Sequence, residues 1–330
     1  MTTKLLQPTE QNIEKCAELL RNGQIVAFPT ETVYGLGSNA LDGKAVLKIF
    51  EAKGRPATNP LIVHVSNKSQ IESVAYVTEA AQKLIDALMP GPLTLVLNKK
   101  PNIPDEVTAG FDTVGVRMPD HPIALKLIEK AGMPICAPSA NTSSRPSPTR
   151  AEHVFEDLNG KIPAIIDGGK CPLGMESTII KMTDEPQLIR AGSVPLSEIE
   201  KIIGKINSDA AFTRELDPTK APTQFVPRIN MMFSSYFTGM ANNINSYYDT
   251  LVQNSEKPVI FCLDGRVDKY GGRDVITMGE SVGDYARNLF EKIREAEKKY
   301  TVIIAEGVPK SEMGMTLQSR LVKLSHGQVI

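Results

Sequence analysis

The sequence predicts an α/β (α+β) protein in which a twisted mixed sheet is partly covered by flanking helices. Short apolar runs of strand length alternate with amphipathic helical patterns through residues 1–204. Both element types within one stretch of chain favour a sheet packed against helices over an all-helical or all-strand domain. A third observation excludes a coiled coil, because 23 Pro and 24 Gly interrupt the 330-residue chain throughout.

The expected helices are marked by apolar spacing and by the glycines beyond their ends, and the expected strands are short apolar runs bounded by turn residues. The helix expected at Gln11–Arg21 is followed by Gly23, and the helix expected at Lys44–Ala52 is followed by Gly54. The other expected elements are strands Ile25–Phe28 and Leu61–Val65, helix Thr78–Leu88, strands Leu93–Leu97 and Thr113–Arg117, helix Ile123–Ala131, strand Ile135–Ala137, and two helices starting with capping-box spacing at Thr149–Glu152 and Ser197–Glu200.

Periodicity weakens after residue 204, and residues 205–256 are expected to form a linker. This segment contains Pro218, Pro222 and Pro227, followed by a polar stretch between residues 242 and 254. Residues 257–330 again alternate strands with helices, as in a small Rossmann-like α/β domain with a parallel sheet. Its expected elements are strands Val259–Leu263, Val275–Met278 and Val302–Ala305, helix Ser281–Lys299, and a last helix near Met315–Leu324.

The balance of charge argues against a polyanion as the main partner. The chain has 37 basic and 38 acidic side chains; residues 1–204 hold 21 and 23, a sum of −2, and residues 205–330 hold 16 and 15, a sum of +1. Neither part shows the basic excess of a nucleic-acid-binding module, so stable binding of nucleic acid is not expected. No apolar run approaches the roughly 18 residues of a membrane span, and the N-terminus lacks the apolar core of a signal peptide. We expect a soluble cytoplasmic protein.

Several chemistries lack their sequence signatures. There is no GxxxxGK[ST] loop for phosphates and no GxSxG elbow for a serine nucleophile. Neither the cysteines nor the histidines show the spacing of a metal site, so no protein-bound metal is expected. The residues concerned are Cys16, Cys136, Cys171, Cys262, His64, His121, His153 and His326.

Polar, turn-rich segments follow four of the expected strands, which is where α/β folds place their sites. The first covers residues 28–37 and contains Gly35 and Gly37. These two glycines lack the third glycine of a dinucleotide fingerprint, and no helix follows at once. We expect them to mark a tight turn.

The second segment covers residues 53–64 and begins with Lys53 and Arg55 at the end of a helix. Two cations one residue apart suit the oxygens of a polyphosphate. The alternative is a basic helix end that complements the helix dipole. His64 alternates with the apolar residues of its strand and faces away from them, so ligand contact and a structural role are both open.

The third and fourth segments cover residues 113–121 and 136–149. Arg117 ends a strand in the third segment, where a guanidinium either clamps a carboxylate with two parallel bonds or pairs with an internal acid. The fourth segment offers many hydroxyl and amide groups just after a buried strand. Its alternative interpretation is an ordinary loop rich in Ser and Pro.

Seven motifs in a fixed order resemble those of the threonylcarbamoyl-AMP synthase family, in its two-domain long form. The motifs are PTETVYGLG, KGRPATNPLIVH, PGPLTLVL, TVGVRMPDH, APSAN, GMESTII and LIRAG. The resemblance covers nearly the whole chain. It implies a YrdC-like catalytic domain at 1–204, with a twisted mixed sheet and flanking helices, followed by the linker and the small domain at 257–330.

The family joins L-threonine, bicarbonate and ATP, the last carried with Mg²⁺, into threonylcarbamoyl-AMP and pyrophosphate. The product passes to a tRNA threonylcarbamoyl transferase, which makes N6-threonylcarbamoyladenosine (t6A). By resemblance, the catalytic Lys-x-Arg and Ser-x-Asn tetrad falls on Lys53, Arg55, Ser139 and Asn141. The resemblance adds ATP contacts at Asn59, Thr113, Ser147 and Arg190, beside Arg55 and Ser139 of the tetrad. It places the L-threonine pocket at Thr32, His64, Arg117, Ala137 and Ser177.

The linker departs from the family pattern. The family carries a His-Tyr-x-Pro motif there, which lies over the active site, whereas this chain has Gln224, Phe225, Val226 and Pro227. Three other functions remain as alternatives: an RNA-binding YrdC-like module without synthase activity, a related carbamoyl-transferring maturation enzyme, and an adenylate-forming ligase for another amino acid.

Overall fold

The chain folds into two compact units in the computed structural model, which describes residues 2–208 and 226–330. The first unit comprises Met1–Ser143 and Ser147–Ser208, and the second comprises Ser144–Pro146 and Asp209–Ile330. Gln224 and Phe225 of the expected linker motif lie outside the described residues. Among those described, no helix is both long and apolar enough to cross a bilayer.

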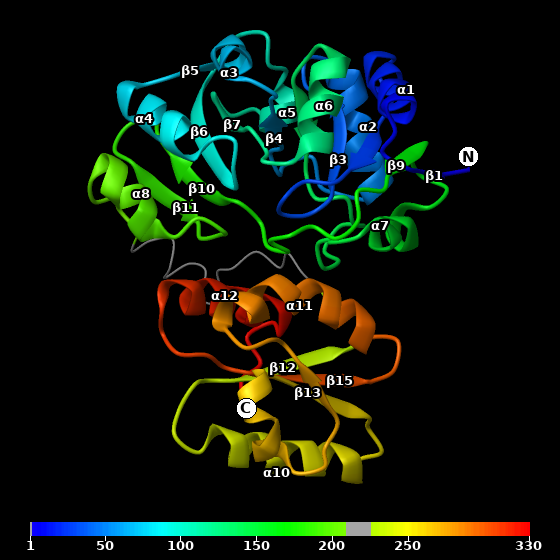
Figure 1. Ribbon diagram of the computed structural model, residues 1–330, viewed down its shortest axis with the longest axis vertical. Coiled ribbons are helices and arrows are strands. Elements are labelled where there is room, and N and C mark those ends of the chain that lie inside the picture. Colours follow the sequence, from blue (N-terminus) through cyan, green and yellow to red (C-terminus); the bar gives the residue numbers. More distant parts are fainter. Residues whose placement is uncertain (1, 209–225) are drawn as a thin grey trace. The chain divides into compact units, whose positions relative to one another are not determined.

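A mixed sheet of eleven strands runs through the described part of the first unit, in the order β1-β9-β2-β3-β8-β4-β7-β6-β10-β11 with β5 paired to β6. The strands are β1 (Lys4–Leu6), β2 (Val26–Phe28), β3 (Gly35–Asn39), β4 (Ile62–His64), β5 (Ala75–Tyr76), β6 (Leu93–Lys99), β7 (Thr113–Arg117), β8 (Ile135–Ala137), β9 (Ala164–Ile166), β10 (Thr178–Lys181) and β11 (Gln187–Arg190). Parallel and antiparallel pairs alternate irregularly across it: β4 is parallel to β7 and antiparallel to β8. The twisted mixed sheet with flanking helices is therefore confirmed (Figure 1).

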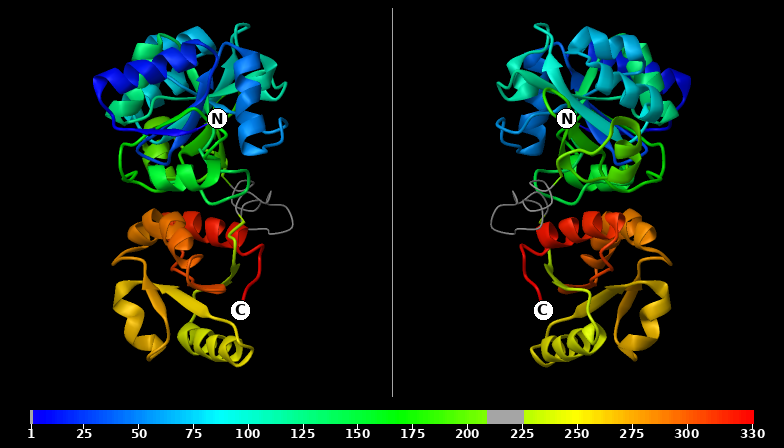
Figure 2. Two further views of the ribbon diagram at one scale, coloured as in Figure 1. Left: turned by 90° about the vertical axis from the view of Figure 1, so that its right-hand side faces the viewer. Right: turned by 90° about the vertical axis from the view of Figure 1, so that its left-hand side faces the viewer.

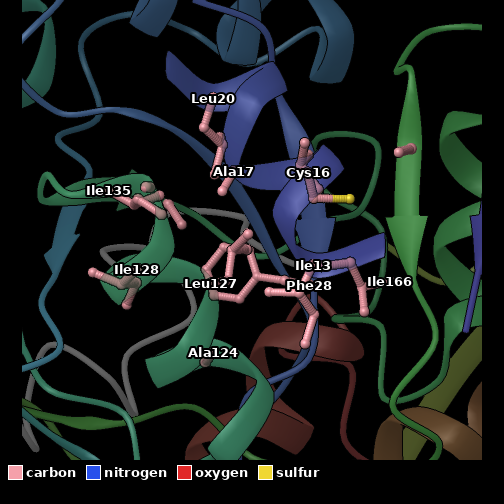
Figure 3. Close-up of a cluster of buried hydrophobic side chains, with 14 residues drawn as sticks. Ile13, Cys16, Ala17, Leu20, Phe28, Ala124, Leu127, Ile128, Ile135 and Ile166 are labelled. Atoms are coloured by element: carbon pink, nitrogen blue, oxygen red, sulfur yellow. The ribbon is translucent and has the colours of Figure 1, made fainter. Parts of the chain in front are cut away.

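The helices of the first unit lie between these strands along the chain. They are α1 (Glu10–Arg21), α2 (Gly43–Lys53), α3 (Lys68–Val74), α4 (Glu79–Leu88), α5 (Asp105–Thr108), α6 (Pro122–Ala131), α7 (Ala151–Leu158) and α8 (Leu196–Ile203). Figure 3 shows how α1 and α6 bury one side of the sheet around Phe28. Leu20 and Leu127, one from each helix, are fully buried in this cluster. The ring of Phe28 thereby fixes the strand that leads into the segment at residues 28–37.

Gly35 and Gly37 lie in strand β3 and not in the tight turn that the sequence predicted. The strand pairs antiparallel with β2, and its Ser38 and Asn39 pair with β8. Packing explains the glycines, because a Cβ on Gly37 would lie 2.7 Å from Cγ2 of Ile135 and 2.8 Å from the Phe28 ring. The missing side chains let neighbouring residues close over the strand.

The two predicted capping boxes are wrong, although both helices are present. Helix α7 has Arg150, not Thr149, at its N-cap and shows no side-chain cap bond, and Thr149 lies against Nδ1 of His153. Helix α8 begins after Pro195, which places Ser197 within its first turn. Spacing alone identified the helices but not their first residues.

The second unit contains a four-stranded parallel sheet in the order β12-β15-β13-β14, which confirms the expected parallel α/β sheet. Helix α10 covers one face, and α11 and α12 cover the other (Figures 1 and 2). The elements are β12 (Asn230–Ser234), α10 (Met240–Gln253), β13 (Pro258–Cys262), the 3₁₀ helix η1 (Asp264–Tyr270), β14 (Val275–Thr277), α11 (Val282–Ala296), β15 (Val302–Glu306) and α12 (Glu312–Leu324).

The expectation of a linker throughout residues 205–256 is wrong for β12 and α10, which belong to the second unit. The polar segment forms a helix because Met240, Ile244 and Tyr248 recur at four-residue spacing and are buried on one face. The domain therefore begins before residue 257.

Candidate active site

Three residues of the predicted threonine pocket end adjacent strands of the large sheet. His64 is the last residue of β4 and pairs in register with Arg117, the last residue of the parallel strand β7. Ala137 ends β8 on the other side of β4, where it pairs with Ile62. Because β4 runs parallel to β7 and antiparallel to β8, the pairing sets His64 beside Arg117 where their strands end, and sets Ala137 beside Ile62, two residues back along β4.

The imidazole of His64 is buried and neutral. Its side chain lies edge-on to Phe28, with ring centroids 6.2 Å apart, and Nδ1 lies 3.1 Å from the carbonyl oxygen of Ile62. Burial, followed by the neighbouring charge of Arg117, lowers the pKa of His64 to about 3. The neutral ring therefore donates from Nδ1 to Ile62, which leaves the lone pair of Nε2 as an acceptor.

Arg117 forms an ion pair with an internal acid, which was one of its two sequence interpretations. Its Nη2 lies 2.7 Å from Oε2 of Glu31, and both side chains are 5% exposed. Its Nε donates to the carbonyl oxygen of Gly91 at 3.4 Å. The Glu31 backbone is held in turn, because its carbonyl oxygen accepts from the amide of Leu173 at 2.9 Å.

The turn between β2 and β3 carries Glu31 and Thr32 and is organised by Thr30. The Thr30 hydroxyl oxygen accepts from the amides of Thr32 and Val33, each at 3.2 Å. The hydroxyl oxygens of Thr30 and Thr32 lie 2.8 Å apart. All four residues from 30 to 33 are buried, so this turn holds Glu31 in a fixed place beside Arg117.

The tetrad residues Lys53, Ser139 and Asn141 form one hydrogen-bonded group. The Lys53 ammonium donates to the carbonyl oxygen of Ser139 at 2.5 Å and to that of Asn141. The Ser139 hydroxyl donates to Oδ1 of Asn141 at 2.5 Å. Lys53 is 2% exposed, and burial, followed by the charge of Arg55, lowers its pKa. Lys53 thus bonds the loop that carries the other two residues.

Arg55, the fourth member, follows Gly54, whose φ of 61° turns the chain at the end of α2. Its Nη2 donates to the carbonyl oxygen of Pro60 at 3.3 Å, and its buried Nε has no acceptor among the described residues. Burial lowers the pKa of this guanidinium. Arg55 therefore lies at the start of the same loop as Asn59, whose side chain is exposed.

Arg190 and Ser177 join the predicted ATP and threonine contacts. Nε and Nη2 of Arg190 both donate to the Ser177 carbonyl oxygen, at 3.1 and 2.9 Å, and Nη2 lies 3.1 Å from the Ser177 hydroxyl. That hydroxyl lies 2.8 Å from the hydroxyl of Thr94 in β6. Ser147 is buried, and its hydroxyl donates to Oε1 of Glu176 at 3.2 Å.

Thr113 is not brought to this group by any described contact. It begins β7 and pairs with Asn98 of β6, whereas Arg117 ends the same strand. Four residues of strand separate them by about 13 Å at about 3.3 Å per residue. The structure thus places Thr113 at the opposite end of β7 from the strand edge that carries Arg117.

Four buried residues near the site were missed by sequence reasoning: Thr30, Glu31, Tyr34 and Glu176. The Tyr34 hydroxyl donates to the carbonyl oxygen of Gly169 at 2.8 Å and accepts from the amide of Gly168 at 3.1 Å. Three of the four lie in the motif PTETVYGLG, from which only Thr32 was selected. The motif itself was the signal in the sequence that could have found them, and the structure shows that its residues from 30 to 34 are all buried.

Within residues 2–208 and 226–330, no three His, Cys, Asp or Glu side chains are grouped to hold a metal ion. The described site presents instead cationic groups, hydroxyls, amides and one internal ion pair. This set suits phosphate oxygens and an amino acid.

Comparisons with known proteins cover both units. A family model described as "Telomere recombination" matches residues 18–192, and one described as "Threonylcarbamoyl-AMP synthase, C-terminal domain" matches residues 196–324. Threonylcarbamoyl-AMP synthase from Pyrococcus abyssi is 44% identical, covering 97% of this chain and 96% of the relative. The enzyme of that name from Bacillus subtilis is 39% identical, covering 99% of this chain and 97% of the relative.

The solved structure of P. abyssi Sua5 in complex with L-threonine has the same fold. It aligns with a TM-score of 0.91 and 42% identity, covering 99% of each chain. The two family models together account for most of both units, and the full-length relatives share both parts in the same order. The chain therefore belongs to the threonylcarbamoyl-AMP synthase family.

Proposed function

We propose that this chain is an L-threonylcarbamoyladenylate synthase, a nucleotidyltransferase that converts L-threonine, bicarbonate and ATP into threonylcarbamoyl-AMP and pyrophosphate. The observation that carries the proposal is the spacing of Ala137, the last residue of β8, and Ser139, two residues later in the loop that Lys53 holds. This spacing supports a threonine pocket next to the phosphate-binding tetrad. The names of the relatives and the L-threonine bound to P. abyssi Sua5 support the same activity.

The residue roles follow from the family motifs, and the hydrogen bonds among Lys53, Ser139 and Asn141 support them, whereas no described contact supports the role of Thr113. Lys53, Arg55, Ser139 and Asn141 bind the phosphates and activate the α-phosphorus. The further ATP contacts are Asn59, Thr113, Ser147 and Arg190, and the threonine pocket comprises Thr32, His64, Arg117, Ala137 and Ser177. Arg117 binds the threonine carboxylate through a nitrogen that is not engaged by Glu31. The acceptor nitrogen of neutral His64 is suited to the threonine hydroxyl.

The reaction requires no nucleophile from the protein. The threonine amine takes up bicarbonate as a carbamate with loss of water. A carbamate oxygen then forms a bond to the α-phosphorus as the bond to the pyrophosphate oxygen breaks. The chain contributes positioning and neutralises developing charge with Lys53 and Arg55. We treat Mg²⁺ as part of the ATP substrate, where it neutralises phosphate charge.

Water must be kept from this site, because the carbamate decomposes and the mixed anhydride hydrolyses. The burial of His64, Arg117 and Ser177 supports such a dry pocket. We also propose that the product passes to a tRNA threonylcarbamoyl transferase for t6A formation in the cytoplasm, where tRNA and ATP are found. The nearly neutral charge of both parts of the chain suits a small-molecule enzyme that does not bind tRNA stably.

The test is pyrophosphate release from ATP and bicarbonate with L-threonine, with L-serine and without an amino acid. We expect release to require threonine, and Lys53→Ala or Arg55→Ala to abolish it. Lys44→Ala is the matched control, since Lys44 is exposed at the other end of α2. Full activity of either tetrad variant would overturn the residue assignment. RNA binding without turnover would favour the alternative of an RNA-binding module.

A further inference from the structure

Glu31 places a negative charge inside the proposed threonine pocket. Glu31 is buried, with its side chain 5% exposed, and Oε2 lies 2.7 Å from Nη2 of Arg117. The other oxygen, Oε1, is buried and has no hydrogen-bond donor among the described residues. Few hydrogen bonds therefore neutralise this carboxylate, and in a buried site its charge acts strongly on any nearby ligand.

The Glu31–Arg117 pair has no net charge, and the titratable side chains next to it are uncharged. Arg117 and Glu31 contribute one positive and one negative charge. His64 is neutral because burial lowers its pKa to about 3, and burial also lowers the pKa of nearby His121. The thiol of Cys171 stays protonated because burial raises its pKa to about 12. A ligand beside this pair thus meets two adjacent opposite charges that sum to zero.

The positive member of this pair keeps one nitrogen for a ligand. Nε of Arg117 faces Gly91 and Nη2 faces Glu31, whereas Nη1 has no partner among the described residues. A carboxylate at Nη1 is therefore attracted by Arg117 and lies close enough to Glu31 to be repelled by it. An ammonium group on the same ligand is attracted by Glu31, and this attraction offsets the repulsion between Glu31 and the ligand carboxylate.

We propose that Glu31 is a specificity-determining residue, which makes the pocket selective for a zwitterionic amino acid over a plain carboxylate. The inference rests on the proposed function for the identity of the amino acid, L-threonine. Glu31 acts partly by holding Arg117 and partly by opposing anions that lack an ammonium group. Selectivity then comes from a built-in repulsive element as well as from attraction.

The test compares two ligands that differ only at the α-position. Binding of L-threonine and of its 2-hydroxy analogue, 2,3-dihydroxybutanoate of the same stereochemistry, is measured by titration calorimetry on the full chain without ATP. The wild type is expected to prefer threonine by at least about 30-fold. Glu31→Gln keeps the size of the side chain and removes its charge. It is expected to weaken threonine binding about 10-fold and to strengthen binding of the hydroxy analogue several-fold.

Opposite shifts for the two ligands are the result that a merely structural role would not produce. Equal loss for both ligands in Glu31→Gln, or no change for either, overturns the proposal. If Glu31→Gln does not fold, the same two affinities are measured for Glu31→Asp, which keeps the negative charge. The preference for threonine is then retained if the proposal is right and lost if it is wrong. Glu79→Gln, which removes an exposed carboxylate paired with Lys83, is the control and leaves both affinities unchanged.

The binding test is separate from the test of the proposed function. A wild type that binds threonine selectively but releases no pyrophosphate would overturn the synthase assignment and leave the role of Glu31 standing. A wild type that turns over threonine but binds the hydroxy analogue equally well would overturn the role of Glu31 alone.

Discussion

The side-chain ammonium of Lys53 lies 2.5 Å from the backbone carbonyl oxygen of Ser139, so the last residue of α2 is bonded to the loop after β8. The backbone reinforces the link, because the amide of Ser143 donates to the carbonyl oxygen of Lys53 at 2.8 Å. Lys53 therefore shapes the loop that presents Ser139 and Asn141, in addition to supplying charge.

Replacing Lys53 with Met is expected to reduce both activity and stability. The change removes the donor from the partly buried carbonyl oxygen of Ser139 and the buried one of Asn141, at a cost of about 1–3 kcal/mol for an unsatisfied group. We expect the rate of pyrophosphate release to fall at least about 100-fold, and the free energy of unfolding to fall by about 2 kcal/mol in urea titrations. Lys44→Met, at the exposed start of α2, is the control. Unchanged stability of Lys53→Met would contradict the structural half of this role.

His64 predicts a defined dependence of stability on pH. Its pKa is lowered from 6.5 to about 3 in the folded state, chiefly by burial. Below pH 6.5 His64 binds a proton in the unfolded chain but stays neutral in the folded chain. Its contribution to the free energy of unfolding is therefore fully present above that pH and is lost as the pH falls toward 3. From pH 7.5 to pH 5 the loss is about 2 kcal/mol, at about 1.4 kcal/mol per pH unit.

The measurement is urea unfolding of the wild type and of His64→Gln at both pH values. The variant lacks the titrating group, and its stability should fall by about 2 kcal/mol less than that of the wild type over this interval. His326→Asn is the control, since His326 is exposed and Asn tolerates its φ of 52°. Parallel losses in His64→Gln and the wild type would show that His64 is not the group responsible.

Where the sequence predicted elements well, a local signal was sufficient. The strands Thr113–Arg117 and Ile135–Ala137 were predicted to the residue, because short apolar runs stand between polar segments. Strand β3 was missed because Gly35 and Gly37 have low strand propensity, and only pairing with β2 and β8 makes them a strand.

In the site, too, the sequence predicted the residues that stand in motifs but not the contacts that depend on the fold. The order of motifs identified Lys53 and Ser139 as residues of one site, and the hydrogen bond between them agrees with this. The partner of Arg117 could not be selected from the sequence, because Glu31 lies far away along the chain and no spacing rule joins a turn to the end of another strand. The ion pair exists only through the order of the strands.

Arg190 predicts coupled effects on the two substrates. As a proposed ATP contact, it also donates to the carbonyl oxygen and approaches the hydroxyl of Ser177, in the proposed threonine pocket. Arg190→Lys replaces a planar group with a single ammonium and cannot keep all these contacts. We expect the KM values for ATP and for threonine to rise together, and kcat/KM to fall about 10-fold, the equivalent of about one charged hydrogen bond.

Steady-state pyrophosphate release with each substrate varied in turn provides the check on Arg190. Arg21→Lys serves as the control, because Arg21 forms an exposed ion pair with Glu14 on α1. A rise in the KM for ATP with an unchanged KM for threonine would show that the contact with Ser177 does not transmit between the two sites.

Gly37→Ala tests whether close packing is the reason for the glycine in β3. A Cβ there would lie 2.7 Å from Ile135 and 2.8 Å from Phe28, both fixed in the core around α1 and α6. Overpacking of this kind costs about 1–3 kcal/mol, and we expect a loss of that size in urea unfolding. Gly115→Ala is the matched control, because Gly115 lies in β7 of the same sheet and its Cβ would meet Thr94 at an ordinary 3.4 Å. Since both changes add one methyl group to a strand glycine, equal changes in stability would mean that the close approach of Phe28 and Ile135 does not decide the cost.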